Sequence, residues 1–255
     1  MDLALFQRQY RKDLTDQSKN TLAGSLWLLI EPAIMLLVYS FVFSVIFTAR
    51  AGSGHDSPFI VYLAVMMWPW FAFSQALSRS LSVLDENMGL MRKMALDKHA
   101  LVAARVCSVF TLQSLAYLLV LLVLLVLTGG VDFTRIWIVL LSVLQLLLAA
   151  LGLAYLFSAL AVFVRDIKLA MPMLIMLMFF CSPIIWTVEM IPQQYRHLLD
   201  YNPLTHVATA VRGALLQGET LLSGGWWWNW LLAAVLLLLG WWVFSRLAPW
   251  FEEYA

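Results

Sequence analysis

The chain has 255 residues, of which 63% are hydrophobic and 12% charged, with a net charge of +1 and a mean hydropathy of +0.85. A soluble domain of this length carries about twice that charged fraction, so the chain cannot cover its surface with polar groups and lipid is its expected solvent. The near-neutral charge gives no reason to expect a nucleic-acid partner. Cys107 and Cys181 lie in apolar runs, which predicts core residues and neither a disulfide nor a metal site.

The N-terminal segment, residues 1–25, is too polar at its start for a signal peptide. Within it, Leu3, Phe6, Tyr10 and Leu14 recur at helical spacing among charged and amide side chains. This periodicity predicts an amphipathic helix that lies along the cytoplasmic face of a membrane.

Six apolar stretches are long enough to cross the roughly 30 Å of hydrocarbon in a bilayer. They cover residues 26–48, 58–78, 101–128, 135–164, 168–187 and 226–247. Six spans put both termini on one side, and the distribution of Lys and Arg indicates that this side is the cytoplasm. Of the 16 basic residues, only four then fall outside: Arg50, Arg135, Arg196 and Arg212. The sequence therefore predicts an all-α integral membrane protein with six transmembrane helices and both termini cytoplasmic.

The chain contains no internal repeat, low-complexity tract or long linker, which predicts a single membrane domain over residues 1–255. Its expected parts are the interface helix in 1–25, a six-span bundle over 26–247, a cytoplasmic loop over 79–100 and an outer segment over 184–225.

The two loop segments also have helical character. The cytoplasmic loop after the second span is polar enough to leave the membrane and rich enough in Leu and Met to form short helices. Pro183 is expected to end the fifth span. In the outer segment, Pro192 and Pro203 each stand where a first helical turn could begin, and Asn202 is a suitable N-cap. We expect two short helices there, starting at these prolines, ending near Asp200 and Leu216, and dipping into the outer leaflet.

No motif for covalent chemistry occurs in the sequence. An ATP-binding loop needs glycines followed by Lys and then Ser or Thr, and the chain has no Gly-Lys pair. The histidines lie in different loops without zinc-site spacing: His55, His99, His197 and His206. We predict no catalytic residue and no metal site, so an energised transporter of this sequence must take its energy from a partner.

Glu31 precedes Pro32 early in the first span, near the expected cytoplasmic headgroups. It either caps a local break or pairs with a basic residue of the N-terminal helix, or it lines the cytoplasmic entrance of a transport pathway. Arg105, Arg165 and Asp166 fall at cytoplasmic span ends, where they can reach water by snorkelling. Arg165 and Asp166 belong to the same entrance in the pathway interpretation.

Aromatic side chains are the other positive signal. Trp residues at span ends usually form an interfacial belt, which is the expected role of the cluster Trp226–Trp230. Aromatic residues deeper in the spans fit a belt less well, and their ring faces would stack against the apolar C–H faces of a sugar. The candidate channel-lining residues are Tyr39, Phe43, Trp68, Trp70, Phe71 and Trp186.

Small residues in the fourth span predict close helix packing. Ala150, Ala154 and Ser158 repeat every four residues, with Gly152 beside them. The packing partner is either another helix of the same chain or a second subunit.

A series of short landmarks runs along the chain. They are Leu22-Ala-Gly-Ser-Leu-Trp27 with Glu31-Pro32, Tyr62-Leu63, Trp68 to Phe71, Asn87 with Arg92-Lys93, Val164-Arg165-Asp166, Ser182-Pro183-Ile184 and Tyr201-Asn202-Pro203-Leu204. In this order and spacing, and over nearly the whole chain, they resemble the membrane subunits of ABC exporters for bacterial surface polysaccharides (O-antigen, capsule and teichoic acid chains). One departure is that many relatives carry Phe-Pro-Arg after the basic pair, where this chain has Met94-Ala-Leu-Asp-Lys98. This departure leaves the exported polymer open.

The resemblance implies an inner-membrane homodimer that encloses a channel, with two copies of a separate ATPase on the cytoplasmic side. That ATPase would bind ATP and Mg, so no cofactor is expected in this chain. The resemblance makes Asp85 to Lys98 the coupling helix that receives the ATPase's motion, and it makes the helices around Pro192 and Pro203 the outer gate, together with Tyr195 and Asn202. The expected coupling residues are Asp85, Glu86, Asn87, Met91, Arg92 and Lys93.

The leading hypothesis is therefore a permease that exports a lipid-linked polysaccharide with energy from a partner ATPase. Two alternatives remain open. One is an ABC permease of the same fold for a drug or small lipid. The other is a membrane-embedded enzyme that modifies glycans or lipids, against which the sparse charges argue.

Overall fold

A computed structural model of the chain describes residues 2–19, 26–42, 59–91, 96–218, 220 and 224–251. These residues form helices joined by turns, with no strand among them, which confirms the all-α prediction. The longer helices are α1 (Leu3–Lys19), α2 (Trp27–Phe41), α3 (Phe59–Ser80), α4 (Val83–Met91), α5 (Lys98–Thr128), α6 (Ile136–Phe163), α7 (Asp166–Cys181), α9 (Pro203–Arg212) and α10 (Gly224–Leu247). Short helical segments are Val188–Met190, α8 (Gln193–Arg196), His197–Tyr201, Gly213–Gln217 and Ala248–Trp250.

In the described part of the chain, four helical stretches are long and apolar enough to cross a membrane. They are Phe59–Met91 (α3 with α4), Lys98–Thr128, Ile136–Phe163 and Gly224–Trp250. The other two predicted spans are shorter helices, since α2 has 15 residues and α7 has 16. Residues 43–48 of the predicted first span lie outside the described residues.

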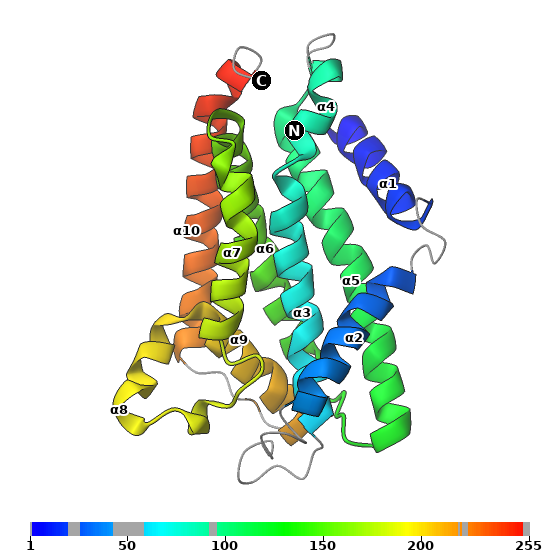
Figure 1. The fold of residues 1–255 in the computed structure, drawn as a ribbon, viewed down its shortest axis with the longest axis vertical. Coiled ribbons are helices and arrows are strands. Elements are labelled where there is room, and N and C mark those ends of the chain that lie inside the picture. Colours follow the sequence, from blue (N-terminus) through cyan, green and yellow to red (C-terminus); the bar gives the residue numbers. More distant parts are fainter. Residues whose placement is uncertain are drawn as a thin grey trace.

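The bundle is built around α3, which lies between α2, α5 and α6 (Figure 1). Its side chains from Val61 to Met67 are almost completely buried. A proline can end the regular part of a helix, but α3 continues through Pro69 to Ser80. Proline removes one backbone hydrogen bond, and the buried rings of Trp68 and Trp70 on either side hold the helix in the core.

The closest helix pair is α6 with α10, which run side by side (Figure 1). A Cβ atom on Gly240 would lie 2.0 Å from the carbonyl oxygen of Gly152, and one on Gly152 would lie 2.5 Å from the backbone of Leu236. Only glycine allows this approach. The predicted small-residue contact at Gly152 is therefore made within one chain.

The helices alternate between two ends of the bundle (Figure 1). One end, called the α4 end here, carries α1, α4, the start of α5 and the end of α10. The opposite α9 end carries α8 and α9 with the turn between α5 and α6. Near Pro192 the structure has α8 followed by the short helix His197–Tyr201, and from Pro203 it has α9 followed by the segment Gly213–Gln217. Their position in an outer leaflet stays a prediction.

The helix within the predicted span 168–187 ends at Cys181, two residues before Pro183, which was expected to end it, and residues 182–187 form turns. Ser182 is extended, with φ −107° and ψ 147°. A residue before proline is pushed out of the helical region, so Pro183 ends the helix from one residue away. Ser182, Ile184 and Thr187 are nevertheless buried, so this stretch is non-helical backbone inside the protein.

The predicted coupling helix over Asp85 to Lys98 also has different bounds. Its helix, α4, starts at Val83 and ends at Met91, and residues 92–95 lie outside the described residues. Asp97 caps α5, because its carboxylate accepts hydrogen bonds from the backbone N–H groups of His99 and Ala100. The expected extent was wrong at this end, since Lys98 already belongs to α5.

Candidate functional site

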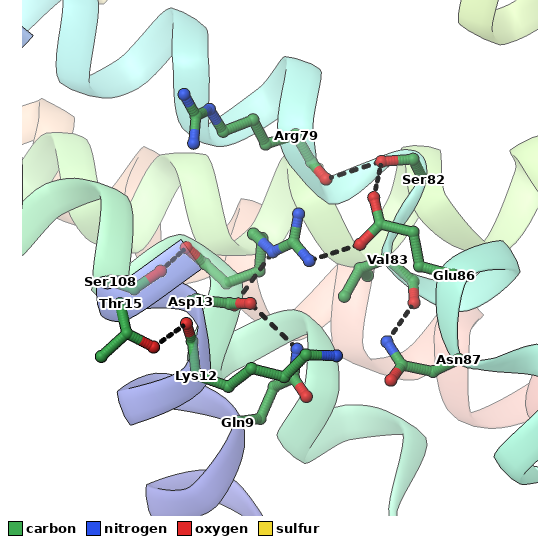
Figure 2. A network of polar contacts seen from close by, with 11 residues as sticks. Gln9, Lys12, Asp13, Thr15, Arg79, Ser82, Val83, Glu86, Asn87 and Ser108 are labelled. Carbon is green, nitrogen blue, oxygen red and sulfur yellow. Dashed lines mark hydrogen bonds and ion pairs between the residues drawn. The ribbon is translucent and has the colours of Figure 1, made fainter. Parts of the chain in front are cut away.

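One arginine joins three helices at the α4 end. Arg105 of α5 donates from Nε to Asp13 Oδ2 of α1 at 2.9 Å, and from Nη2 to Glu86 Oε2 of α4 at 2.6 Å. Figure 2 shows these two contacts as dashed lines that end at Asp13 and at Glu86. Arg105 is 13% exposed and Asp13 only 4%. We call these three residues the Arg105 junction.

The remaining carboxylate oxygens of the junction have partners as well. Gln9 Nε2 donates to Asp13 Oδ1 at 3.0 Å, and Ser82 Oγ donates to Glu86 Oε1 at 2.7 Å (Figure 2). Burial raises the pKa of Asp13 above its ordinary value, and the charge of Arg105 offsets this only in part. The junction therefore depends on Arg105, since without it the Asp13 carboxylate would be a buried charge with no cation bonded to it.

A second ion pair links α4 to the bundle. Lys168, in the first turn of α7, pairs with Asp85 of α4. Asp85 and Glu86 both stand in the first turn of α4, where the helix dipole favours negative charge. Asp85 thus pairs with a cation on α7, and Glu86 pairs with a cation on α5.

The other predicted coupling residues face inward or fall outside the description. Asn87 and Met91 are each 2% exposed, and Asn87 Nδ2 donates to the carbonyl of Val83 at 2.8 Å within α4. Both side chains hold α4 against the bundle, so the exposed surface of α4 must come from other positions. Arg92 and Lys93 lie outside the described residues.

A row of polar side chains connects α2, α3 and α5. Gln75 Nε2 lies 3.5 Å from Glu31 Oε2, and Gln113 Nε2 donates to Gln75 Oε1 at 3.0 Å. Glu31 is exposed on α2, and its partner in the structure is Gln75 of α3. Arg165 and Asp166 are exposed at the turn between α6 and α7. Within the described chain, no hydrogen bond or ion pair joins them to Glu31.

The structure brings two of the predicted aromatic residues together. The rings of Tyr39 on α2 and Trp70 on α3 each lie 5.6 Å from the ring of Phe179 on α7, measured between centroids. Trp68 and Trp70 are 2% and 3% exposed, so in the single chain these rings are packed between helices. Phe71 is half-buried on the same helix.

The remaining aromatic candidates lie apart from this cluster. Trp186 follows α7, where its Nε1 donates to the carbonyl of Phe180 at 3.1 Å and its own carbonyl accepts from Tyr62 Oη at 3.2 Å. Phe43 lies outside the described residues.

A second buried arginine organises the α9 end. Arg212, 6% exposed, donates from Nη1 to the carbonyl of Pro183 at 2.6 Å and from Nη2 to that of Ile184 at 2.8 Å. Its guanidinium lies 3.6 Å over the ring of Tyr62 on α3. Because residues 182–187 are not helical, their carbonyls need partners from outside a helix ladder. Arg212 provides two of them.

Asn202 binds the junction between α7 and this stretch. Its Nδ2 donates to the carbonyl of Cys181 at 3.1 Å and to Ser182 Oγ at 3.0 Å, while its Oδ1 accepts from the N–H of Leu204 at 3.0 Å. The last bond confirms the predicted N-cap, with Pro203 in the first turn of α9. Pro192 stands before α8, and Tyr195 on α8 is exposed.

Arg105 was expected to reach water at a span end, but it is only 13% exposed and binds Asp13 and Glu86, so that prediction was wrong. The sequence patterns did not point to the other residues that make these links: Asp13, Gln75, Gln113 and Arg212. A signal was present for the two arginines, because each interrupts an apolar helical run, and an ionisable residue in such a run needs a partner inside the protein. Gln75 and Gln113 gave a weaker signal of the same kind.

Helices of this length and apolarity define a multi-pass membrane protein of the helical class. The described residues contain no group of His, Cys, Asp or Glu that could hold a metal ion. The model of the ABC-2 type transporter family matches residues 3–216, and the chain belongs to this family.

Curated relatives align over most of the chain. It is 25% identical to the O-antigen export system permease protein RfbA of Klebsiella pneumoniae over 211 residues, which cover 81% of this chain and 78% of that protein. It is 27% identical to the polysialic acid transport protein KpsM of Escherichia coli over 215 residues, which cover 84% of this chain and 81% of that protein. An RfbA of Myxococcus xanthus is 24% identical over 205 residues, covering 78% and 75%.

Proposed function

We propose that the chain is the permease of an ABC exporter that passes a lipid-linked surface polysaccharide outward across the inner membrane. The family membership and the names of the relatives, which are permeases or transport proteins for O-antigen and polysialic acid, support this proposal. A separate ATPase subunit, which binds ATP and Mg, supplies the energy, since this sequence has no ATP-binding loop.

In this proposal α2, α3, α5, α6, α7 and α10 cross the membrane within one domain, with both termini at a cytoplasmic α4 end. The 16 residues of α7 measure about 24 Å at 1.5 Å per residue, less than the roughly 30 Å of hydrocarbon. The buried turns 182–187 continue α7 toward the α9 end and make up the difference. Non-helical backbone is tolerated at membrane depth only where protein satisfies it, as Arg212 does here for Pro183 and Ile184, while Asn202 binds the last carbonyl of α7.

In this proposal the Arg105 junction couples movement of the ATPase to movement of the permease helices. Two copies of the ATPase bind at the α4 end and move α4, the coupling helix, through its exposed residues and the neighbouring Arg92 and Lys93. Glu86 transmits the movement through Arg105 to α5 and α1, and Asp85 transmits it through Lys168 to α7. Ion pairs suit this task because they link rigid helices without continuous backbone between them.

The path for the glycan forms between two copies of the chain. In one copy the aromatic cluster of Tyr39, Trp70 and Phe179 is packed between α2, α3 and α7, while the outer sides of α2 and α7 are apolar and exposed. A homodimer covers these sides and encloses the channel. The channel residues in this proposal are Tyr39, Phe43, Trp68, Trp70, Phe71 and Trp186, with Glu31, Arg165 and Asp166 at the cytoplasmic entrance and Pro192, Tyr195, Asn202 and Pro203 at the outer gate.

Depletion of the protein tests this function. Cells that lack it should hold finished polysaccharide in the cytoplasm and show none at the surface, and a plasmid copy should restore surface polymer. Normal surface polymer in depleted cells would overturn the proposal. If such cells became sensitive to a drug instead, the second hypothesis of a drug or small-lipid permease would replace it.

A further inference from the structure

A groove with a volume of about 580 Å³ opens between α5 and α6. One stripe of α5 and one stripe of α6 line it, including Thr111, Ser114 and Leu118 on α5 and Leu140, Leu144 and Leu147 on α6. Side chains at this three- and four-residue spacing share one helix face and normally interdigitate with a neighbouring helix. Here the two stripes stand apart, so the space between them needs another occupant.

The groove is long enough for most of one leaflet's depth. From Ser114 to Leu121 its lining on α5 measures about 10 Å at 1.5 Å per residue. One leaflet contributes about 15 Å of hydrocarbon, so the groove holds the part of an acyl chain nearest the headgroup. In a membrane-spanning bundle, an apolar groove of this size is filled by lipid, because empty space would leave its lining without van der Waals contacts.

The two ends of the groove differ in chemistry. Toward the α9 end the lining is Leu, Ile and Val with Tyr117, whose hydroxyl donates to the carbonyl of Val65 at 2.6 Å, whereas the α4 end carries Thr111 and Ser114. Thr111 is engaged, since it accepts from Tyr10 Oη of α1 at 2.9 Å and donates to the carbonyl of Cys107 at 2.8 Å. Ser114 is exposed, and its hydroxyl has no hydrogen-bond partner among the described residues. An unpaired hydroxyl next to hydrocarbon favours an acceptor such as an ester carbonyl.

The helix that contacts the polar end, α1, carries positive charge. Arg8, Arg11 and Lys12 are exposed on α1, within two residues of Tyr10, which contacts the groove residue Thr111. Cationic side chains at the membrane surface attract anionic lipid headgroups. The polar end of the groove therefore matches a negatively charged headgroup, and the apolar end matches its tail.

We propose that the α5–α6 groove is a binding site for one anionic phospholipid of the leaflet at the α4 end. An acyl chain lies between Leu118 and Leu140, an ester carbonyl accepts from Ser114, and the phosphate lies by the basic residues of α1. The lipid thereby ties α1 to α5 beside the Arg105 junction. The site is independent of what the protein transports.

Native mass spectrometry of the purified protein with its ATPase tests the site. The complex is taken from nanodiscs that contain equal amounts of phosphatidylglycerol and phosphatidylcholine. The expected result is one retained phosphatidylglycerol for each copy of the chain, with phosphatidylcholine lost. Equal retention of the two lipids would overturn the proposal, because it would show only the surrounding bilayer.

A matched pair of variants locates the lipid. Leu118 and Leu119 are neighbours on α5 with 47% and 48% exposure, but only Leu118 lines the groove. The variant Leu118→Trp should lose the retained phosphatidylglycerol, and Leu119→Trp should keep it. Leu140→Trp fills the groove from α6 and serves as a second test should Leu118→Trp be poorly folded. Retention in folded Leu118→Trp and Leu140→Trp, or equal loss in Leu119→Trp, would overturn the assignment.

Discussion

Arg105 and Arg212 are both buried arginines in apolar helices, yet they bind different kinds of partner. Arg105 pairs with two carboxylates, each on a separate helix with its own hydrogen-bonded backbone. Arg212 binds the backbone carbonyls of Pro183 and Ile184, which lie in non-helical chain. Side-chain ion pairs can separate while the helices stay folded, whereas loss of the carbonyl partner leaves polar backbone buried. The α4 end is thus suited to transmit movement and the α9 end to hold a fixed backbone shape.

The largest effect is expected from Arg212→Met. Two short hydrogen bonds from a charged donor are lost, and at about 1.5–3 kcal/mol each the free energy of unfolding should fall by about 3–6 kcal/mol. The measurement is thermal unfolding of the solubilised protein. Arg212→Lys keeps the charge but not the two-pronged geometry and should fall between wild type and Arg212→Met. An unchanged melting temperature in Arg212→Met would show that the carbonyls find other partners.

Removal of Arg105 should lower the free energy of unfolding nearly as much, but a second substitution should restore most of this loss. Arg105→Met leaves the Asp13 carboxylate buried without its cation, at about 3–5 kcal/mol. The double variant Arg105→Met with Asp13→Leu removes both charges and should recover most of this loss. Thermal unfolding together with limited proteolysis of α1 measures the loss of stability and its recovery. If the double variant lost as much stability as the two single variants together, Arg105 and Asp13 would not interact, and the junction would be contradicted.

The glycine contact between α6 and α10 should respond to a single methyl group. Gly240→Ala places a Cβ against the Gly152 carbonyl and should cost about 1–3 kcal/mol by forcing the helices apart. Gly89→Ala on α4 is the control, because no atom lies within 4 Å of its added Cβ. Gly240→Ala should lower the melting temperature, whereas Gly89→Ala should raise it or change it much less. Equal shifts in the two variants would refute the close packing.

The smallest effect on stability, and a larger one on function, is expected from Lys168→Asp. The Asp85–Lys168 pair is partly exposed, so its loss should change the free energy of unfolding by only about 0–1 kcal/mol. If α4 is the coupling helix, ATP hydrolysis by the complex should drive less transport. The charge swap Lys168→Asp with Asp85→Lys should restore the ratio of polymer exported to ATP hydrolysed. Export at the wild-type ratio in the single variant would remove this link from the mechanism.

Much of the fold could be predicted because it depends on local signals. Long apolar runs predicted α3, α5, α6 and α10, and the pair Asn202-Pro203 predicted the start of α9. The early end of α7 was also available locally, since a residue before proline avoids the helical region. The apolar run alone extends to residue 187, whereas Pro183 marks the end of α7 to within two residues.

The links between helices could not be predicted in the same way. Arg105 and Asp13 are 92 positions apart in the chain, and either arginine could equally have reached water by snorkelling. The choice depends on how α1 packs against α5, which no local pattern reports. The expected roles of the aromatic and gate residues stay predictions, because they depend on a second copy of the chain.

The most direct test of the account is transport in inside-out proteoliposomes that contain the chain and its ATPase. With ATP, the wild-type complex should carry lipid-linked polysaccharide into the lumen, where added glycosidase cannot reach it. Glu86→Gln should still hydrolyse ATP but carry little polymer, because the charge that joins α4 to Arg105 is gone. Polymer protected to the same extent with and without ATP, or carried equally by Glu86→Gln, would contradict the account.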